Sequence, residues 1–346
     1  MHHLPAASLF LLLLLGGCNA TNHQPHRNDP VAENMLLYQL DHGGWPQDHG
    51  DDVAYEKELS TVERATVIKN KAKMRGTIDD QSTTREIVYL LEANGQKANA
   101  SYLAAAKKGL RFLLSAQGVA GGWPQEYPNP ESYHQHITYN DNAMIDVLHV
   151  MKETAEGKGV YAVLDQELKK EAAAAVRRGI DCILRTQFVS RSGQLTVWCA
   201  QHDSQTLQPA SARKFEPASL SGSESVEIIR FLMEIEQPSE AVKAAVRAGV
   251  AWFDQVRIDG YRLKAIKDAK QPKGEDRVLL PKPGHTCWAR FYELDTYRPV
   301  FTGRDGIVRY DLREIENERR VGYRFYGDWA EELVDEELDH WESRIK

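Results

Sequence analysis

The sequence predicts an all-α protein, an (α/α) toroid of repeated helical hairpins with long loops around a central cleft and few short strands. Two observations support this fold class. An Ala-rich helical segment occurs three times, and loops with Gly and Trp lead from helices into further helices that open with small polar residues. Helical pairs repeated at a fixed period stack as a solenoid or close as a toroid. The long loops, rich in Trp, Tyr, Gly and acids, favour closure around one cleft.

The N-terminal residues are predicted to lie outside the folded domain. The apolar run in "LFLLLLLGGC" has the length of a signal-peptide core and is too short to span a bilayer. Its end resembles a bacterial lipobox, after which Cys18 would carry lipid. We therefore expect a signal peptide (1–17), a flexible tether (18–32) and a single toroid domain (33–346). The protein would be an exported lipoprotein, anchored through Cys18 at the outer membrane, at the cell surface or in the periplasm. An ordinary signal peptide or a cytoplasmic start is the alternative, since no Lys or Arg precedes the apolar run.

Three segments define the repeated helix. They are "AAAKKGLRFLLSAQ" from residue 104, "AAAVRRGIDCILRTQ" from residue 173 and "AAVRAGVAWFDQV" from residue 244. Their glycines, Gly109, Gly179 and Gly249, align without gaps and are evenly spaced. Chance would seldom place such segments so evenly, so we predict a repeated helical unit.

The loops after these helices also repeat. "GGWPQ" occurs at 43–47 and again at 121–125, and a Trp lies near the corresponding place in "SGQLTVWCAQHD". Each loop leads into a helix that opens with small polar residues. Strands should be few, with a small pair near "GQLTVWC" and "YRLKAI".

Composition excludes some classes of protein. The formal charge is −7 and no long basic run is present, so nucleic acid is not an expected partner. No protein partner is indicated, and we expect a monomer. The chain has no P-loop, GxGxxG, GxSxG, HExxH or paired CxxC motif. Besides Cys18, the three cysteines at 182, 199 and 287 allow either one disulfide and a free thiol or three buried thiols.

Short oxygen-bearing residues open the second helix of each unit. They are Asp79 and Asp80, Asn140 to Asn142, and Ser221 to Glu224. Helix capping alone explains any one of these groups. Closure into a ring would instead gather them at one mouth, where carboxylate and amide oxygens suit Ca²⁺, which takes six to eight oxygen ligands. Asp141 would supply charge, with Asn140 as a cap or neutral contact.

Cationic residues occur among aromatic ones in the second half of the chain. Arg213 and Lys214 precede the third helix start, and Arg298 and Arg304 lie in "RFYELDTYRPVFTGRDG". Such mixtures recognise carboxylates and sugar faces, because guanidinium groups match carboxylates and rings stack on sugars. Ion pairs that only stabilise the fold are the alternative. His202 is either a base or, as we favour, a structural histidine.

Several of these motifs, taken together and in order, resemble the pectate lyases of polysaccharide lyase family ten. They are "GGWPQ", "TIDDQSTT", "ITYNDNAM", "WCAQHDSQTLQPASARKFEPASLSGSES", "RFYELDTYRPVFTGRDG" and "ERRVGYRFYG", and they span roughly residues 33 to 335. The resemblance implies an (α/α) toroid that cleaves polygalacturonate with the help of Ca²⁺.

The resemblance also implies roles for individual residues. Asp79 and Asp141 would handle calcium and the substrate carboxylate, with Asp79 counted among the catalytic residues, and Arg213 would be the catalytic base. Arg298 or Arg304 would hold a uronate carboxylate. The remaining expected substrate contacts are Asp80, Lys214, Trp123 and Asn140. Asp80 stands where the family often has Asn.

The implied reaction is β-elimination of polygalacturonate to 4,5-unsaturated oligogalacturonates. Two alternatives remain at this point. The first is a glycoside hydrolase acting on uronate-containing glycans, with two of Asp79, Asp141 and Glu224 as acid and base. The second is a non-catalytic pectin-binding surface lipoprotein.

Overall fold

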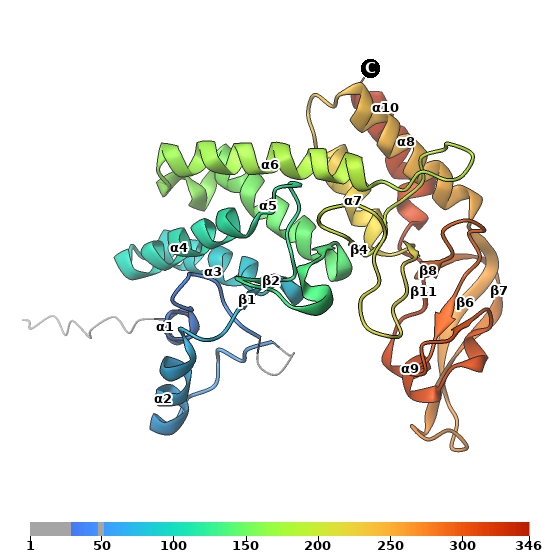
Figure 1. Ribbon diagram of the computed structural model, residues 1–346, viewed down its shortest axis with the longest axis horizontal. Helices are drawn as coiled ribbons and strands as arrows, with labels where there is room; N and C mark the ends of the chain where they lie inside the picture. Colours follow the sequence, from blue (N-terminus) through green and yellow to red (C-terminus); the bar gives the residue numbers. More distant parts are fainter. Residues whose placement is uncertain (1–28, 48–51, 346) are drawn as a thin grey trace, which may run out of the picture.

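The computed structural model describes residues 29–47 and 52–345, and most of its regular structure is helical (Figure 1). The prediction of a mainly helical protein is confirmed. The α-helices are α1 (Pro30–Tyr38), α2 (Thr61–Asn70), α3 (Thr84–Gln96), α4 (Ala100–Ala116), α5 (Ala143–Glu156), α6 (Gln166–Thr186), α7 (Glu224–Met233), α8 (Glu240–Gln255), α9 (Asn317–Gly322) and α10 (Leu338–Arg344). A π-helical turn, η6 (Leu333–Glu337), leads into α10.

The repeated unit is a pair of packed helices. α3 packs on α4, α5 on α6 and α7 on α8, while α4, α6 and α8 follow one another as one layer and α3, α5 and α7 as another (Figure 1). The three aligned glycines lie where the layers touch. A Cβ at Gly109 would lie 2.7 Å from Ile87, and one at Gly179 would lie 2.5 Å from Leu148. Gly249 meets Ile229 in the same way, so the glycines permit close helix packing.

A buried tryptophan fixes each loop to the helix before it. The indole N–H groups of Trp45, Trp123 and Trp198 donate to the main-chain oxygens of Met35, Leu113 and Ile183, at 2.7–2.8 Å. Trp288 makes the same bond to Phe253 after α8. All four indoles are buried. The repeated Trp of the sequence pattern therefore corresponds to a repeated hydrogen bond between the indole N–H and a main-chain oxygen.

Short strands join successive loops into one rim. β1 (Gly76–Thr77) pairs with β2 (Glu126–Tyr127), β3 (Ile137–Thr138) with β4 (Gln201–His202), and β5 (Leu220–Ser221) with β8 (Phe291–Tyr292). β9 (Phe301–Thr302) pairs with β10 (Val308–Arg309). β1, β3 and β5 come just before α3, α5 and α7, so the starts of these helices are tied to the following loop.

The expected pair of strands was wrong in its partner and its length. "YRLKAI" lies in β6 (Ile258–Lys267), which pairs with β7 (Glu275–Ala289) in a long antiparallel hairpin extended by β11 (Tyr326–Gly327). The segment "GQLTVWC" instead folds back on its own loop, where the main chains of Phe188 and Thr196 bond to each other. Its last residues pair with β5 and not with β6, since the Ser221 N–H donates to the Trp198 oxygen and Cys199 bridges to Leu220.

The N-terminal boundary also differs from expectation. α1 begins at Pro30, with Asp29 as its side-chain cap, so residues 30–32 form a helical turn and not the end of a tether. The predicted signal peptide and Cys18 lie outside the described residues. The cysteines at 182, 199 and 287 are free and buried, which decides between the two alternatives. In the described part of the chain no helix is long and apolar enough to cross a bilayer.

Candidate metal and substrate site

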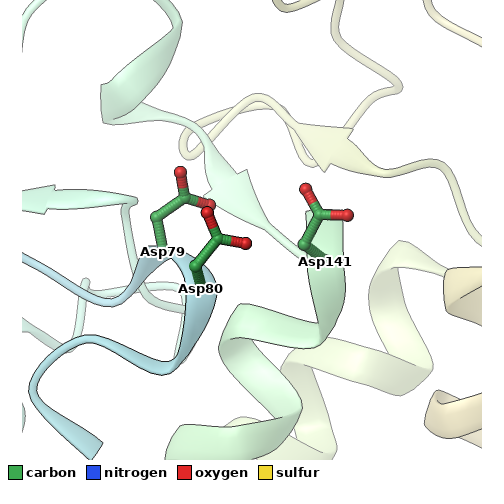
Figure 2. A group of neighbouring side chains, drawn as sticks. All are labelled: Asp79, Asp80 and Asp141. Carbon is green, nitrogen blue, oxygen red and sulfur yellow. The ribbon is translucent and has the colours of Figure 1, made fainter. Parts of the chain in front are cut away.

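Three carboxylates from two helix starts converge at the rim. Asp79 and Asp80 belong to the turn η1 (Asp79–Gln81) before α3, and Asp141 belongs to the turn η3 (Asn140–Asn142) before α5. One oxygen of each lies within 4.8 Å of one oxygen of the others. Figure 2 shows the three carboxylates pointing to the same side, across the gap between the two turns.

Unusual backbone angles turn the acids away from their helices. Asp80 has φ 44° and Asp141 has φ 47°, in a region that costs a non-glycine residue roughly 1 kcal/mol. Capping would place these carboxylates on free N–H groups at the start of α3 and α5. Asp141 instead contacts Asn140 and Arg290, and Asp80 accepts from Gln47 at 3.4 Å. The capping interpretation of these acids is therefore wrong.

The clustering changes the acidity of the pair in η1. Burial, together with the charges of Asp80 and Asp141, raises the pKa of Asp79 to about 6. Burial and the charge of Asp141 also raise the pKa of Asp80. Raised carboxyl pKa values mean that the folded chain disfavours full ionisation of the cluster. A bound cation would relieve this repulsion.

The donor set fits a hard divalent cation. Three carboxylates offer six oxygens, and half-buried Asn140 lies beside them. Ca²⁺ prefers oxygen ligands in this number, and neither Cys nor His joins the cluster among the described residues. Ser221 to Glu224, the third predicted group, does not join it. The Ser221 hydroxyl contacts Glu224, whose other oxygen meets Arg290.

The two "GGWPQ" copies each place a glutamine beside the acids. Gln47 donates to Asp80, and Gln125 hydrogen-bonds to Asp79. Trp123, predicted as a substrate contact, is fully buried and bonded to Leu113. That prediction is corrected, because an enclosed indole has no surface to offer a sugar. The two glutamines were not predicted as site residues, although the repetition of the motif was a signal that could have found them.

Arg213 and Asp79 line the same pocket. It has a volume of about 560 Å³, and Tyr133 and Arg75 also line it. The Arg213 guanidinium pairs with the carboxylate of Glu216, and this hydrogen bond raises the pKa of Arg213. The structure thus brings the predicted base to the acids, in its charged form.

Three guanidinium groups surround the ring of Phe215. The distances from their central carbons to the ring centroid are 5.2 Å for Arg213, 4.6 Å for Arg304 and 4.4 Å for Arg319. Arg319 also lies 4.8 Å from the ring centre of Tyr323. Such cation–π contacts hold cations of like charge near one another.

Arg319 is the least neutralised of the three. It is buried, its Nε and Nη2 have no hydrogen-bond partner, and it forms no ion pair with a described carboxylate. Burial lowers its pKa. Its motif, "ERRVGYRFYG", does not reveal which arginine lacks a carboxylate partner, so this role could not be predicted from the sequence.

The other predicted cations occupy different positions. Arg304 pairs with Glu318 at 2.6 Å and lies beside Arg213 over Phe215. The exposed Lys214 packs against Gly306. Arg298 stacks on Tyr310 at 3.8 Å. Within the described residues, Arg298 contacts neither the acids nor Phe215.

Arg290 connects the acids to the third helix start. Its Nη2 donates to Asp141 at 2.8 Å and also contacts Glu224, and the side chain is 11% exposed. Its guanidinium lies 4.6 Å from the ring centre of Tyr323, on which Arg319 also packs. The sequence does not indicate a separate role for this arginine, because its partners lie 66 and 149 residues away.

His202 is structural, as favoured from the sequence. It is completely buried, its Nε2 accepts from the Cys199 N–H, and its Nδ1 contacts the Leu207 oxygen. Burial lowers its pKa to about 4. It has no path to a substrate.

Clustered acids and arginines on the rim of a helical-pair scaffold are suited to binding an anionic polymer together with a cation. Comparisons with known proteins give the family. The family described as pectic acid lyase matches residues 39–334. A family 10 polysaccharide lyase from Cellvibrio cellulosa has 34% identity and a TM-score of 0.77, covering 89% of this chain and 91% of its own. An Asp-to-Ala mutant from the same organism, in complex with trigalacturonic acid, has 34% identity and a TM-score of 0.78, covering 89% and 92%. No curated protein matches the chain.

The chain therefore belongs to the pectic acid lyase family. It is a polysaccharide lyase, and its substrate class is pectate.

Proposed function

We propose that this pectate lyase is calcium-dependent and cleaves polygalacturonate by β-elimination, leaving 4,5-unsaturated oligogalacturonates. The observation that carries the proposal is the convergence of Asp79, Asp80 and Asp141 beside a pocket shared with Arg213. The solved relative with trigalacturonic acid supports galacturonate as the sugar. We further infer that the arc of helical pairs is part of a toroid.

The three aspartates hold the cation. When bound, Ca²⁺ draws electron density from the substrate carboxylate and so favours loss of the neighbouring proton. Asp79 is the most buried of the three and is most dependent on the cation for its ionised form. Asn140 supports Asp141 through its side-chain amide.

Arg213 takes the proton from C5 of the uronate. It does so in its neutral form, after its guanidinium has released a proton to solvent. The C5–H electrons form the C4–C5 double bond, and the C4–O bond breaks, leaving its electrons on the departing sugar oxygen. Glu216 opposes this step because its carboxylate stabilises the charged arginine. The uncompensated charge of Arg319 near Phe215 acts in the other direction, since like charges disfavour protonation.

Arg304 is the better candidate for the second uronate carboxylate. It shares Phe215 with Arg213, whereas Arg298 is stacked on Tyr310. Lys214, next to the Arg304 loop, adds positive charge on the same side. Binding would exchange the Glu318 carboxylate on Arg304 for that of the substrate.

The experiment is incubation with polygalacturonate, with and without EGTA, followed by ultraviolet absorbance of the product. We expect absorbance to rise with Ca²⁺ and to stay flat with EGTA. New reducing ends without absorbance would instead indicate a hydrolase. Binding without shortening of the polymer would indicate a non-catalytic protein. Glu224 argues against the hydrolase alternative, because its carboxylate is already paired with Arg290 and Ser221.

We also propose that the protein is an exported monomer, lipidated at Cys18. The short apolar run and the residues before Cys18 support this placement. Labelling with a fatty-acid analogue should mark the wild type and not Cys18→Ser. Equal labelling of the two would remove the anchor.

A further inference from the structure

The hairpin of β6 and β7 concentrates positive charge in an acidic protein. Residues 261–285 contain seven Lys or Arg and three Asp or Glu, whereas the whole chain has a formal charge of −7. One of the three acids, Asp276, is already paired with the buried Arg320 at 2.7 Å. In Figure 1 the hairpin runs along the edge of the molecule opposite α1 and α2.

A pocket lies where this hairpin meets β11. Its volume is about 390 Å³, and Arg262, Arg277, Arg324 and His285 bring positive or titratable nitrogen to its lining. Tyr326 contributes an aromatic ring. Positive groups and an aromatic side chain thus meet in one concave site.

Strand geometry explains why Arg277 faces this pocket. Successive side chains of a strand point to opposite faces. Asp276 is directed to Arg320 on α9, so Arg277 lies on the other face. On that face Arg277 is paired in register with Ala265. Ala265 and Leu263 both line the pocket.

Two of the pocket arginines lack a carboxylate partner. Arg324 pairs with Asp328 at 2.6 Å. Arg262 and Arg277 form no ion pair with any carboxylate in residues 29–47 and 52–345. Unpaired guanidinium groups that line a pocket are suited to bidentate contacts with an external carboxylate.

We infer that this pocket and its hairpin form a second polyuronate-binding surface, which holds the anionic polymer outside the reaction cleft. The choice of ligand rests on the proposed function. The pocket shares no lining residue with the one that contains Asp79 and Arg213. Its concave form, with guanidinium groups in its lining that are free of carboxylate partners among the described residues, favours single carboxylates along a sugar chain over the flat surface of an anionic membrane. The lysines of the strands add longer-range attraction.

The test compares a double variant, Arg262→Gln with Arg277→Gln, with wild type on two substrates. One is long polygalacturonate and the other is a short oligogalacturonate that fills the cleft alone. We expect KM for the polymer to rise about threefold to tenfold at low salt, with kcat unchanged, because the charges of the exposed Arg262 and the half-buried Arg277 are lost. Kinetics on the short substrate should not change. The difference on the polymer should shrink in high salt.

A matched control removes the same charge elsewhere. Lys170→Gln with Arg177→Gln changes two exposed cations on α6, away from the pocket. Equal polymer KM in all three proteins, or an equal rise in the control, would overturn the inference. Cosedimentation with vesicles containing an anionic lipid tests the membrane alternative. Loss of vesicle binding in the double variant with unchanged polymer KM would also overturn it, in favour of a lipid contact.

The outcome is separable from that of the proposed function. If wild type cleaves neither substrate, the lyase proposal fails. Affinity electrophoresis in a polygalacturonate gel still measures polymer binding by the hairpin surface. Retardation of wild type but not of the double variant would support the binding surface. Equal mobility of the two would reject it.

Discussion

The acidic and the cationic halves of the site are held in place by different means. Asp80 and Asp141 lie on strained turns, and their charges repel one another. Arg213, Arg304 and Arg319 instead surround one aromatic ring. The acids therefore gain stability from a cation, while the arginines are already positioned without a ligand. Metal removal should therefore affect the acidic half much more than the cationic half.

The strongest test concerns the cationic half. Arg213→Ala and Arg213→Lys should lower kcat on polygalacturonate by about 10²- to 10⁴-fold, the usual worth of general base catalysis. Product absorbance measures the rate. Arg313→Ala, which changes an exposed arginine paired with Asp311, serves as control and should leave the rate unchanged. Activity near wild type in either Arg213 variant would remove this residue from the chemistry.

The acidic half should respond to Asp79→Asn. We expect kcat/KM to fall about a hundredfold, because a charged ligand and the local field are both lost. Without Ca²⁺ the variant should be more stable than wild type above pH 6, by on the order of 1–3 kcal/mol. The reason is that the variant lacks the buried carboxylate that the charges of Asp80 and Asp141 repel. Thermal unfolding with Ca²⁺ and with EGTA checks both effects. Lower stability in EGTA would show that Asp79 is not under repulsion.

The pH dependence of cation binding sharpens the same point. The pKa of Asp79 is raised to about 6, so protonation competes with the cation below that value. Calcium affinity should fall as the pH decreases through about 6, by up to about tenfold per pH unit. The metal-free fold should instead lose stability as the pH rises from about 4 to 6, where this carboxyl ionises in the folded state. Calorimetric titration between pH 5 and about 7.5 measures the affinity, and a flat profile would contradict the assignment.

Arg319→Met tests whether one arginine at the Phe215 ring changes the protonation of another. Removing the buried charge should shift the acidic limb of the kcat profile to higher pH and lower kcat by about tenfold, because Arg213 is then easier to protonate. Arg319→Lys should restore most of the rate, since it keeps a charge near Phe215. A loss of rate with an unshifted profile in both variants would assign Arg319 to packing alone.

The smallest effect separates two residues of one motif. Gln125→Ala should lower kcat/KM about threefold, through the lost contact to Asp79, with little change in stability. Trp123→Phe should do the reverse. It should cost about 1–3 kcal/mol of unfolding free energy, because the buried Leu113 oxygen loses its donor, while activity of the folded protein is retained. Urea unfolding and initial rates measure the two. An active-site defect in folded Trp123→Phe would revive the predicted sugar contact.

The repeat could be predicted from the sequence because it depends on contacts that recur. Gly109, Gly179 and Gly249 meet the same kind of neighbour in each helical pair, so the same small residue is required each time. The "GGWPQ" copies are constrained in the same way by Trp45 and Trp123. The hairpin of β6 and β7 was not predicted, because it occurs once in the chain and offers no second copy for a sequence comparison.

The site was predictable in part, and the limits have physical causes. Asp79 and Asp141 were grouped correctly, since their helix starts are equivalent in the repeat. The connection of Arg290 to Asp141 and Glu224 depends on the relative placement of distant loops. The exposure of a side chain also depends on the tertiary structure. The letters of the motif do not distinguish the enclosed Trp123 from the neighbouring Gln125.

The indole-to-carbonyl bonds after α1, α4, α6 and α8 divide every long connection into an anchored base and an outer part. Changes in the outer part, including insertions, need not disturb how the helices stack. Sequence changes in one loop at a time could thus alter how the rim contacts its substrate, while the packing of the helices stays the same.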